Sequence, residues 1–217
     1  MEEKESYKEE TVKTFNEAKE NLKNVDIKEE AKIGKGFIKD LIENPAEKIE
    51  SITKDEHNKY FKTIILVTVL WCIAILCRKI ITYIKLESLF KFNTILLLIK
   101  ATIAPIVTIL VLSAIVFILN KERKKTLVTT ITTIGTAKLP LAVASVISLL
   151  SLIDTKANTL ISPINGLLSA VSMILVYFAI KDLFEIEDNT QAIKKFTYCM
   201  IIYEIVAIIC YLFGIYI

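Results

Sequence analysis

Two ionisable residues lie inside long apolar runs of this 217-residue chain, where they could do chemistry. Lys138 lies near the middle of the run 126–153, and Glu204 lies inside the run 196–217. A charge at the centre of a bilayer costs at least about 2.5–3.5 kcal/mol, so such residues commonly pair with each other or mark a path for ions. We therefore predict that Lys138 and Glu204 pair inside the membrane.

The depths of the two residues along their helices favour this pairing. Lys138 follows Lys125 by 13 residues and Glu204 follows Lys195 by 9 residues, which correspond to about 20 Å and about 13 Å of helix. A lysine side chain can cover the difference. The pair would either fix the packing of the helices or serve transport or proton relay. A third alternative is that one or both residues snorkel or face water.

Small or hydroxyl-bearing residues recur at every fourth position of two runs. They are Thr132, Thr136, Pro140, Ala144 and Ser148 in one run, and Ser162, Gly166 and Ala170 in the next. Small residues let membrane helices approach closely, which predicts contact between these two runs; a lipid-lined groove is the alternative. Asn165 needs a hydrogen-bond partner inside a membrane, and we expect it to find one across this contact.

The sequence carries no motif for catalysis or for a cofactor. A glycine-rich phosphate loop, a metal-ligand spacing and a nucleophile with a neighbouring base are all missing. His57 is the only histidine, so a histidine-based triad or cluster cannot form. The four cysteines lie in apolar runs and are interpreted as small hydrophobic side chains. We predict that the protein is not an enzyme and uses no metal or cofactor.

Five apolar runs are long enough to cross a bilayer, which takes about 20 residues of helix. The chain is 53% hydrophobic, and the predicted fold is an all-α integral membrane bundle of five transmembrane helices, preceded by cytoplasmic amphipathic helices. Pro105 predicts a kink in the second span. The spans are expected at about residues 61–83, 93–119, 126–153, 158–180 and 196–217.

The basic residues predict the orientation of these spans. With the N-terminus in the cytoplasm, eleven Lys or Arg residues near span ends lie on the inner side and six on the outer side, as the positive-inside rule favours. The first ten residues have no apolar signal-peptide region, so the first span is expected to drive insertion. Positive charge gathers at span ends, and nucleic-acid binding is therefore not expected.

The first 60 residues have the composition of a soluble segment. They contain 16 acidic and 12 basic residues, against 8 and 15 in the domain 61–217. Residues 1–35 are predicted to form a charged amphipathic helix or a partly disordered tail that contacts protein partners. Residues 36–60 are predicted to form two amphipathic helices, the second with Asn44 as N-cap and Pro45 at its first position. Their apolar face would lie on the membrane surface or pack against the protein's own cytoplasmic loops.

The order of these features resembles the bacterial branch of the Yip membrane-protein family (Ypt/Rab-interacting protein-like). The resemblance covers about residues 37–217 and rests on three segments: ENPAEKI (43–49) before the spans, TTIGTAKLPLAV (132–143) around Pro140, and AIKDLFEIEDNTQAIKKF (179–196) after the fourth span. It implies an integral membrane protein with a cytoplasmic N-terminus, here in a bacterial cytoplasmic membrane. Eukaryotic members are associated with trafficking and membrane shaping. Their DLYGP-type and GY-type signatures are absent here, so binding of Rab GTPases is not implied.

Two functions fit these features. The first is a non-enzymatic membrane-organising or scaffold protein in contact with the lipid bilayer and with a protein partner at its N-terminal segment. The alternative is a small transporter or lipid-handling membrane protein that uses Lys138 and Glu204. Association into a homo-oligomer is compatible with both functions.

Overall fold

The structure is a computed structural model that describes residues 36–37, 39–55, 59–85, 92–120, 125–152 and 158–212. All regular structure in these ranges is helical, which confirms the predicted all-α class. The charged segment 1–35 lies outside the described residues. The elements are α3 (Pro45–Thr53), α4 (Phe61–Lys85), α5 (Phe92–Leu119), α6 (Leu127–Ala137), α7 (Leu139–Ile147), the 3₁₀ helix η2 (Ser148–Leu152), α8 (Asn158–Leu183) and α9 (Asn189–Leu212).

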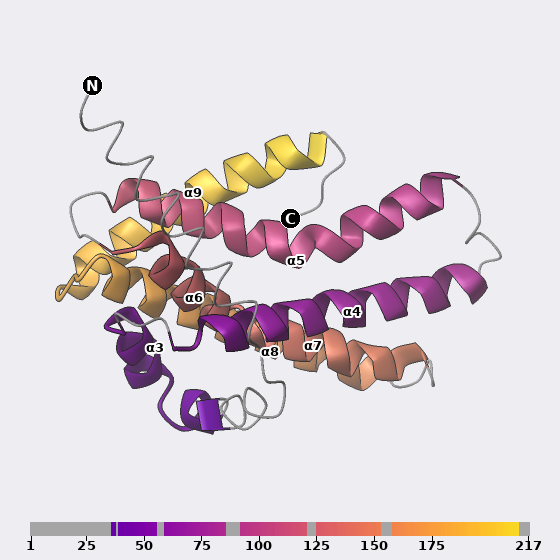
Figure 1. Cartoon of the computed structure of the whole chain (residues 1–217), viewed down its shortest axis with the longest axis horizontal. Coiled ribbons are helices and arrows are strands. Elements are labelled where there is room, and N and C mark those ends of the chain that lie inside the picture. Colours follow the sequence, from indigo (N-terminus) through magenta and orange to yellow (C-terminus); the bar gives the residue numbers. More distant parts are fainter. Residues whose placement is uncertain are drawn as a thin grey trace.

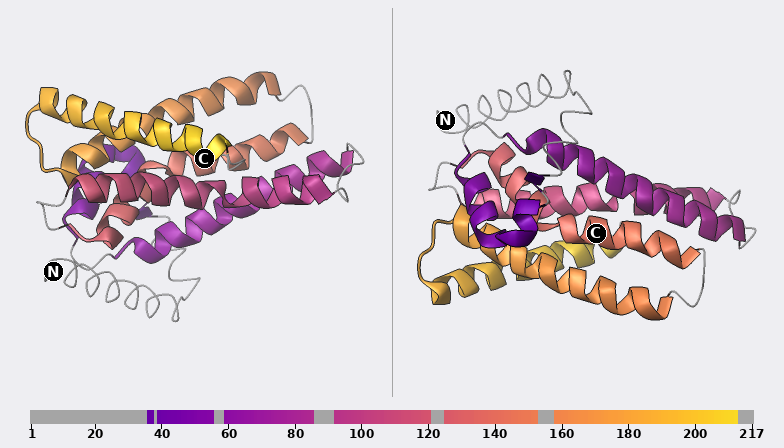
Figure 2. Two further views of the ribbon diagram at one scale, coloured as in Figure 1. Left: turned by 90° about the horizontal axis from the view of Figure 1, so that it is seen from above. Right: turned by 90° about the horizontal axis from the view of Figure 1, so that it is seen from below.

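The long helices run side by side between two ends of a bundle (Figures 1 and 2). We call the end with α3 and the α8–α9 link the α3 end, and the opposite end the far end. Four helices (α4, α5, α8 and α9) are long and apolar enough to cross a membrane, and the α6–α7 pair is a fifth candidate if it counts as one span. Since α6 begins at the α3 end and α7 continues to the far end (Figure 1), the pair is one broken span.

The break in this span follows from Pro140. The two halves, Leu127–Ala137 and Leu139–Leu152, meet at Lys138 with a bend of 41°. Proline has no N–H and its ring crowds the preceding turn, and the N–H of Leu141 bonds the carbonyl of Lys138 at 3.0 Å instead of continuing the α-helical ladder. The carbonyl of Ala137 accepts a hydrogen bond of 2.9 Å from Ser172 of α8. A broken helix is tolerated in a membrane where neighbouring groups satisfy its backbone in this way.

Helix α6 is the most enclosed element of the bundle. Nine of its residues are buried, and the hydroxyls of Thr130, Thr132, Thr133 and Thr136 each donate to the carbonyl four residues earlier. These bonds satisfy the polar atoms that burial would otherwise leave costly. Close packing against α4 occurs at Gly135, where an added Cβ would lie 2.5 Å from Cγ2 of Ile64. Tight backbone approach at glycine is a common way for membrane helices to pack.

The short helix α3 packs on the bundle rather than lying free. Ile49 and Ile52 on its apolar face are 0% and 2% exposed, and α3 contacts α6 and α8. Of the two arrangements that the sequence left open for this face, the structure shows packing against the protein's own elements. The helix begins at Pro45 with Asn44 as its N-cap residue, but the side chain of Asn44 makes no capping hydrogen bond.

Candidate functional sites at the centre and the α3 end of the bundle

Lys138 lies at the break of the third span and is almost completely enclosed. It is 5% exposed, and its ammonium nitrogen lies 5.9 Å from the centroid of the Tyr203 ring of α9. Within the described part of the chain, no carboxylate lies within 4.0 Å of Lys138 Nζ, and no hydrogen bond joins that nitrogen to another residue. The site is therefore a buried cation with an aromatic neighbour and no ion-pair partner.

The predicted ion pair between Lys138 and Glu204 is therefore not formed. Tyr203 is 7% exposed, whereas the next residue, Glu204, is exposed on the outer side of α9. Successive residues of an α-helix point about 100° apart, so only one of these two neighbours can face Lys138. Glu204 remains near enough for a coulombic attraction to Lys138, but it faces away from the bundle.

The third and fourth spans touch, though not through every residue that the sequence suggested. Asn165 donates a hydrogen bond of 2.9 Å to the hydroxyl of Ser148, which is the partner across the two spans that we expected. Gly166 has no atom within 4 Å of its added Cβ position, and Ser162 and Ala170 are exposed like it. The small residues of the fourth span therefore face outward, and the predicted role of Gly166 in helix contact is wrong.

A second enclosed cation, Lys48 of α3, was missed by sequence reasoning. It is 8% exposed, donates hydrogen bonds to Asp40 at 3.1 Å and to the Tyr60 hydroxyl at 2.9 Å, and lies 4.3 Å and 5.2 Å from the ring centroids of Tyr60 and Phe37. Burial opposes the charge, but the bonds to Tyr60 and Asp40 outweigh it and hold the pKa of Lys48 above the usual 10.5. The charged Lys48 therefore stabilises its contacts with Asp40 and Tyr60 at all pH values below the usual lysine pKa of 10.5. This stabilisation is lost only as the pH rises through the raised pKa of the folded protein.

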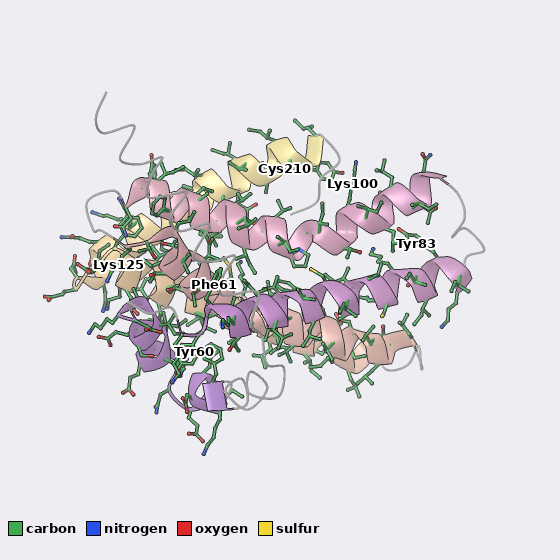
Figure 3. All side chains as sticks on the ribbon, in the orientation of Figure 1. Tyr60, Phe61, Tyr83, Lys100, Lys125 and Cys210 are labelled. Atoms are coloured by element: carbon green, nitrogen blue, oxygen red, sulfur yellow. The ribbon has the colours of Figure 1, made fainter. Side chains whose placement is uncertain are left out.

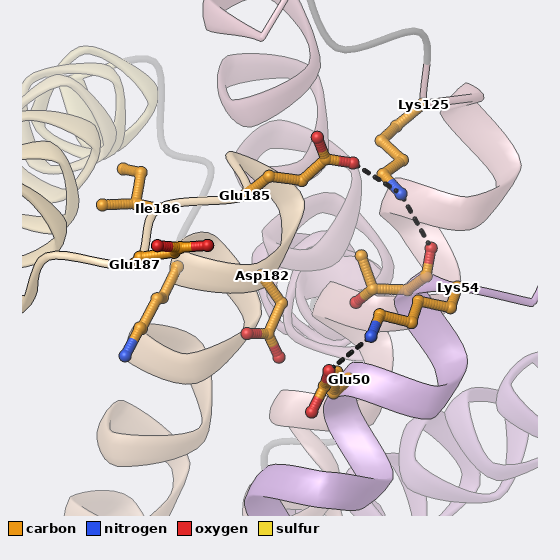
Figure 4. Close-up of a pocket in the computed structure, with 9 residues that line it drawn as sticks. Glu50, Lys54, Lys125, Asp182, Glu185, Ile186 and Glu187 are labelled. Carbon is orange, nitrogen blue, oxygen red and sulfur yellow. Dashed lines mark hydrogen bonds and ion pairs between the residues drawn. The ribbon is translucent and has the colours of Figure 1, made fainter.

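A polar pocket of about 280 Å³ lies at the α3 end (Figure 4). It is built where α3, the start of α6 and the end of α8 meet, and its charged side chains are three lysines and four carboxylates. The lining residues are Glu50, Thr53, Lys54, Lys125, Lys181, Asp182, Glu185, Ile186 and Glu187. In the described part of the chain, no group of three or more His, Cys, Asp or Glu side chains is arranged to hold a metal ion.

The lysines of this pocket are all engaged, while two of the carboxylates are not. Lys54 pairs with Glu50 at 2.5 Å, and this exposed pair raises the pKa of Lys54 and lowers that of Glu50. Lys181 donates to the side chain of Asn189 at 2.8 Å. Among the described residues, Asp182 and Glu187 have neither an ion pair nor a hydrogen bond through their carboxylates. The charged groups of the pocket that have no partner among the described residues are therefore carboxylates.

Lys125 holds the pocket together. Its ammonium pairs with Glu185 at 3.1 Å and donates to the carbonyl of Thr53 at 3.4 Å, so it joins α6 to both α8 and α3 (Figure 4). The turn that presents Glu185 is a Schellman motif, in which Ile186 N–H bonds the Lys181 carbonyl and Glu185 N–H bonds the Asp182 carbonyl. Glu185 has φ 52°, a conformation that favours glycine.

The family model for the Yip1 domain matches residues 39–215. The chain belongs to the Yip1 family. No curated protein and no solved structure matches it. The matched region of this Yip1-family chain contains the broken third span, Lys48 with its hydrogen-bond partners and the polar pocket, and the match confirms the resemblance to the Yip family.

The Lys125–Glu185 pair of this Yip1 domain yields a testable prediction. Lys125→Ala is expected to destabilise the protein by about 1 kcal/mol, because a half-exposed ion pair and a carbonyl contact are lost together. Glu185→Gly loses the same ion pair but removes the left-handed strain of about 1–2 kcal/mol, so it is expected to be neutral or stabilising. Thermal unfolding of the purified variants in detergent measures both effects.

The matched control is Lys54→Ala, which removes an exposed ion pair in the same pocket and should change stability by less than about 0.5 kcal/mol. If Lys125→Ala is as harmless as this control, then Lys125 does not join the three elements.

Proposed function

We propose that this Yip1-family protein is a non-enzymatic, membrane-organising scaffold whose α3 end faces the cytoplasm and contacts protein partners. The Yip1 domain and the apolar helices establish a multi-pass membrane protein. The orientation is supported by the excess of basic residues near the span ends that the sequence assigns to the cytoplasmic side, eleven against six.

The observation that carries the scaffold proposal is the enclosure of Lys138. A transporter needs a path along which water or a substrate reaches the intramembrane charge. Residues around the break are packed: Ile134, Thr136 and Ala137 are fully buried, and Leu139 is 8% exposed. The bundle centre is thus built as a core and not as a channel wall, which favours a rigid membrane element.

The charge distribution at the α3 end supports the contact with partners. Asp182 and Glu187 present carboxylates with no partner among the described residues, and the pocket that they line lies at the α3 end. A partner surface with basic side chains would complement them. The charged segment 1–35 is proposed as a second contact at the same side of the membrane.

Cysteine accessibility tests this function. Leu139→Cys and Leu141→Cys are introduced into a variant in which Cys72, Cys77, Cys199 and Cys210 are replaced by alanine, and sealed vesicles of either orientation are treated with a membrane-impermeant maleimide. We expect no labelling at either position from either side, because both flank the enclosed break.

Asp188→Cys, at an exposed position of the α8–α9 link, is the control and should label rapidly from one side only. Labelling of Leu139→Cys at the rate of this control would contradict the scaffold and support a transporter that uses Lys138 and Glu204.

A further inference from the structure

An apolar groove lies on the flank of the bundle where α4 and α5 pass over α6. Its volume is about 210 Å³. Ile64 and Ile109 form its floor and are 2% and 4% exposed, whereas Val69, Ile106 and Leu110 form its rim and are 40–47% exposed. The groove therefore opens outward, toward the space that lipid occupies around a membrane bundle.

The residues that line this groove have no side-chain polar group that is free to bond water. Its only hydroxyl belongs to Thr68 and already donates to the carbonyl of Ile64 at 2.8 Å. A polar ligand would leave its own groups unsatisfied there. A second helix is about 10–12 Å across with its side chains, too wide for a space of this volume. A flexible hydrocarbon chain meets both conditions.

A free cation lies at the α3-end mouth of the groove. The groove begins at Phe61, the first residue of α4 (Figure 3), and Lys62 follows it. Lys62 lies three and seven residues before Ile65 and Val69, which line the groove, and helical residues at these spacings share a face. Helical side chains lean toward the N-terminus of their helix, so its ammonium is directed to the membrane surface. Among the described residues it has no ion pair or hydrogen bond.

We propose that this groove is a binding site for an anionic phospholipid of the leaflet at the α3 end. One acyl chain fills the groove between α4 and α5, and the phosphate pairs with Lys62. The site and this lipid are complementary, because an apolar groove below an unpaired cation matches an acyl chain below an anionic headgroup. The site does not depend on the scaffold function.

Native mass spectrometry of the full-length protein in detergent tests the site, with dioleoyl phosphatidylglycerol and dioleoyl phosphatidylcholine as probes. The wild-type protein is expected to retain one phosphatidylglycerol in preference to phosphatidylcholine. Lys62→Gln should reduce this preference about fivefold, the effect of one basic residue at an anionic membrane surface. Val69→Phe should fill the groove and weaken the binding of both lipids.

Two matched variants separate this site from general lipid contact. Lys79→Gln removes an exposed lysine near the other end of α4, and Leu70→Phe enlarges a 52% exposed residue of α4 that does not line the groove. Both should bind the two lipids as the wild type does. The proposal is overturned if each control matches its partner variant, or if the wild type shows no preference for phosphatidylglycerol. Because Lys62→Gln changes a surface residue, its result holds even if Val69→Phe folds poorly.

Discussion

Replacing Lys138 with methionine is expected to stabilise the protein by about 1–4 kcal/mol, the upper part of the range found when buried ion pairs are replaced by apolar residues of similar volume. Lys138 is 5% exposed. Among the described residues its charge is compensated by the Tyr203 ring 5.9 Å away and by a coulombic attraction to Glu204, but by no ion pair. Methionine keeps an unbranched, flexible side chain that can fill the same space.

Equilibrium unfolding in mixed micelles measures this effect, and Lys194→Met, at an exposed position of α9, is the control that should stay within about 0.5 kcal/mol of the wild type. A double-mutant cycle with Glu204→Gln should give a coupling below about 0.5 kcal/mol, because the two side chains form no ion pair. A destabilised Lys138→Met with strong coupling to Glu204 would instead restore the intramembrane pair that the sequence suggested.

The elements of this fold that were predictable from sequence are those set by local chemistry. Apolar length located the helices that could cross a membrane, Asn44-Pro45 marked the start of α3, and Pro140 coincides with the break at Lys138. Helix α9, the last predicted span, begins seven residues before the predicted start at Phe196. It begins there because the carboxylate of Asp188 caps it by accepting hydrogen bonds from the N–H groups of Thr190 and Gln191. That signal was present in the sequence but lay outside the apolar run.

The side from which each helix meets its neighbours could not be predicted. A helix in lipid is apolar on all faces, so the periodicity that reveals the buried face of a soluble helix is missing. Glu204 and Gly166 were therefore placed on the wrong faces. The Lys125–Glu185 and Lys48–Tyr60 contacts join residues that are far apart in the sequence, so the sequence alone did not indicate them. The left-handed conformation of Glu185 was not predictable either, because the residue that usually marks it, glycine, is absent at that position.

Two helical glycines are expected to respond in opposite directions to the same substitution. Gly135→Ala gains about 1 kcal/mol of helix propensity, but its methyl group would lie 2.5 Å from Cγ2 of Ile64. Ile64 is 2% exposed and β-branched, so it cannot turn away easily. Overpacking of this kind costs about 1–3 kcal/mol, and a net loss of stability is expected. Gly166→Ala meets no atom within 4 Å and should gain up to about 1 kcal/mol.

A variant that lacks the Ile64 side chain tests whether the clash with Ile64 is what destabilises Gly135→Ala. Ile64→Ala alone is expected to cost about 2–5 kcal/mol, as other large-to-small core changes do. In that background the atom nearest Gly135 is gone, so Gly135→Ala should change from destabilising to stabilising, while Gly166→Ala should keep its sign. Unfolding in mixed micelles distinguishes these outcomes. If Gly135→Ala has the same effect with and without the Ile64 side chain, α4 and α6 do not approach at this glycine, and the enclosure of the third span must come from other contacts.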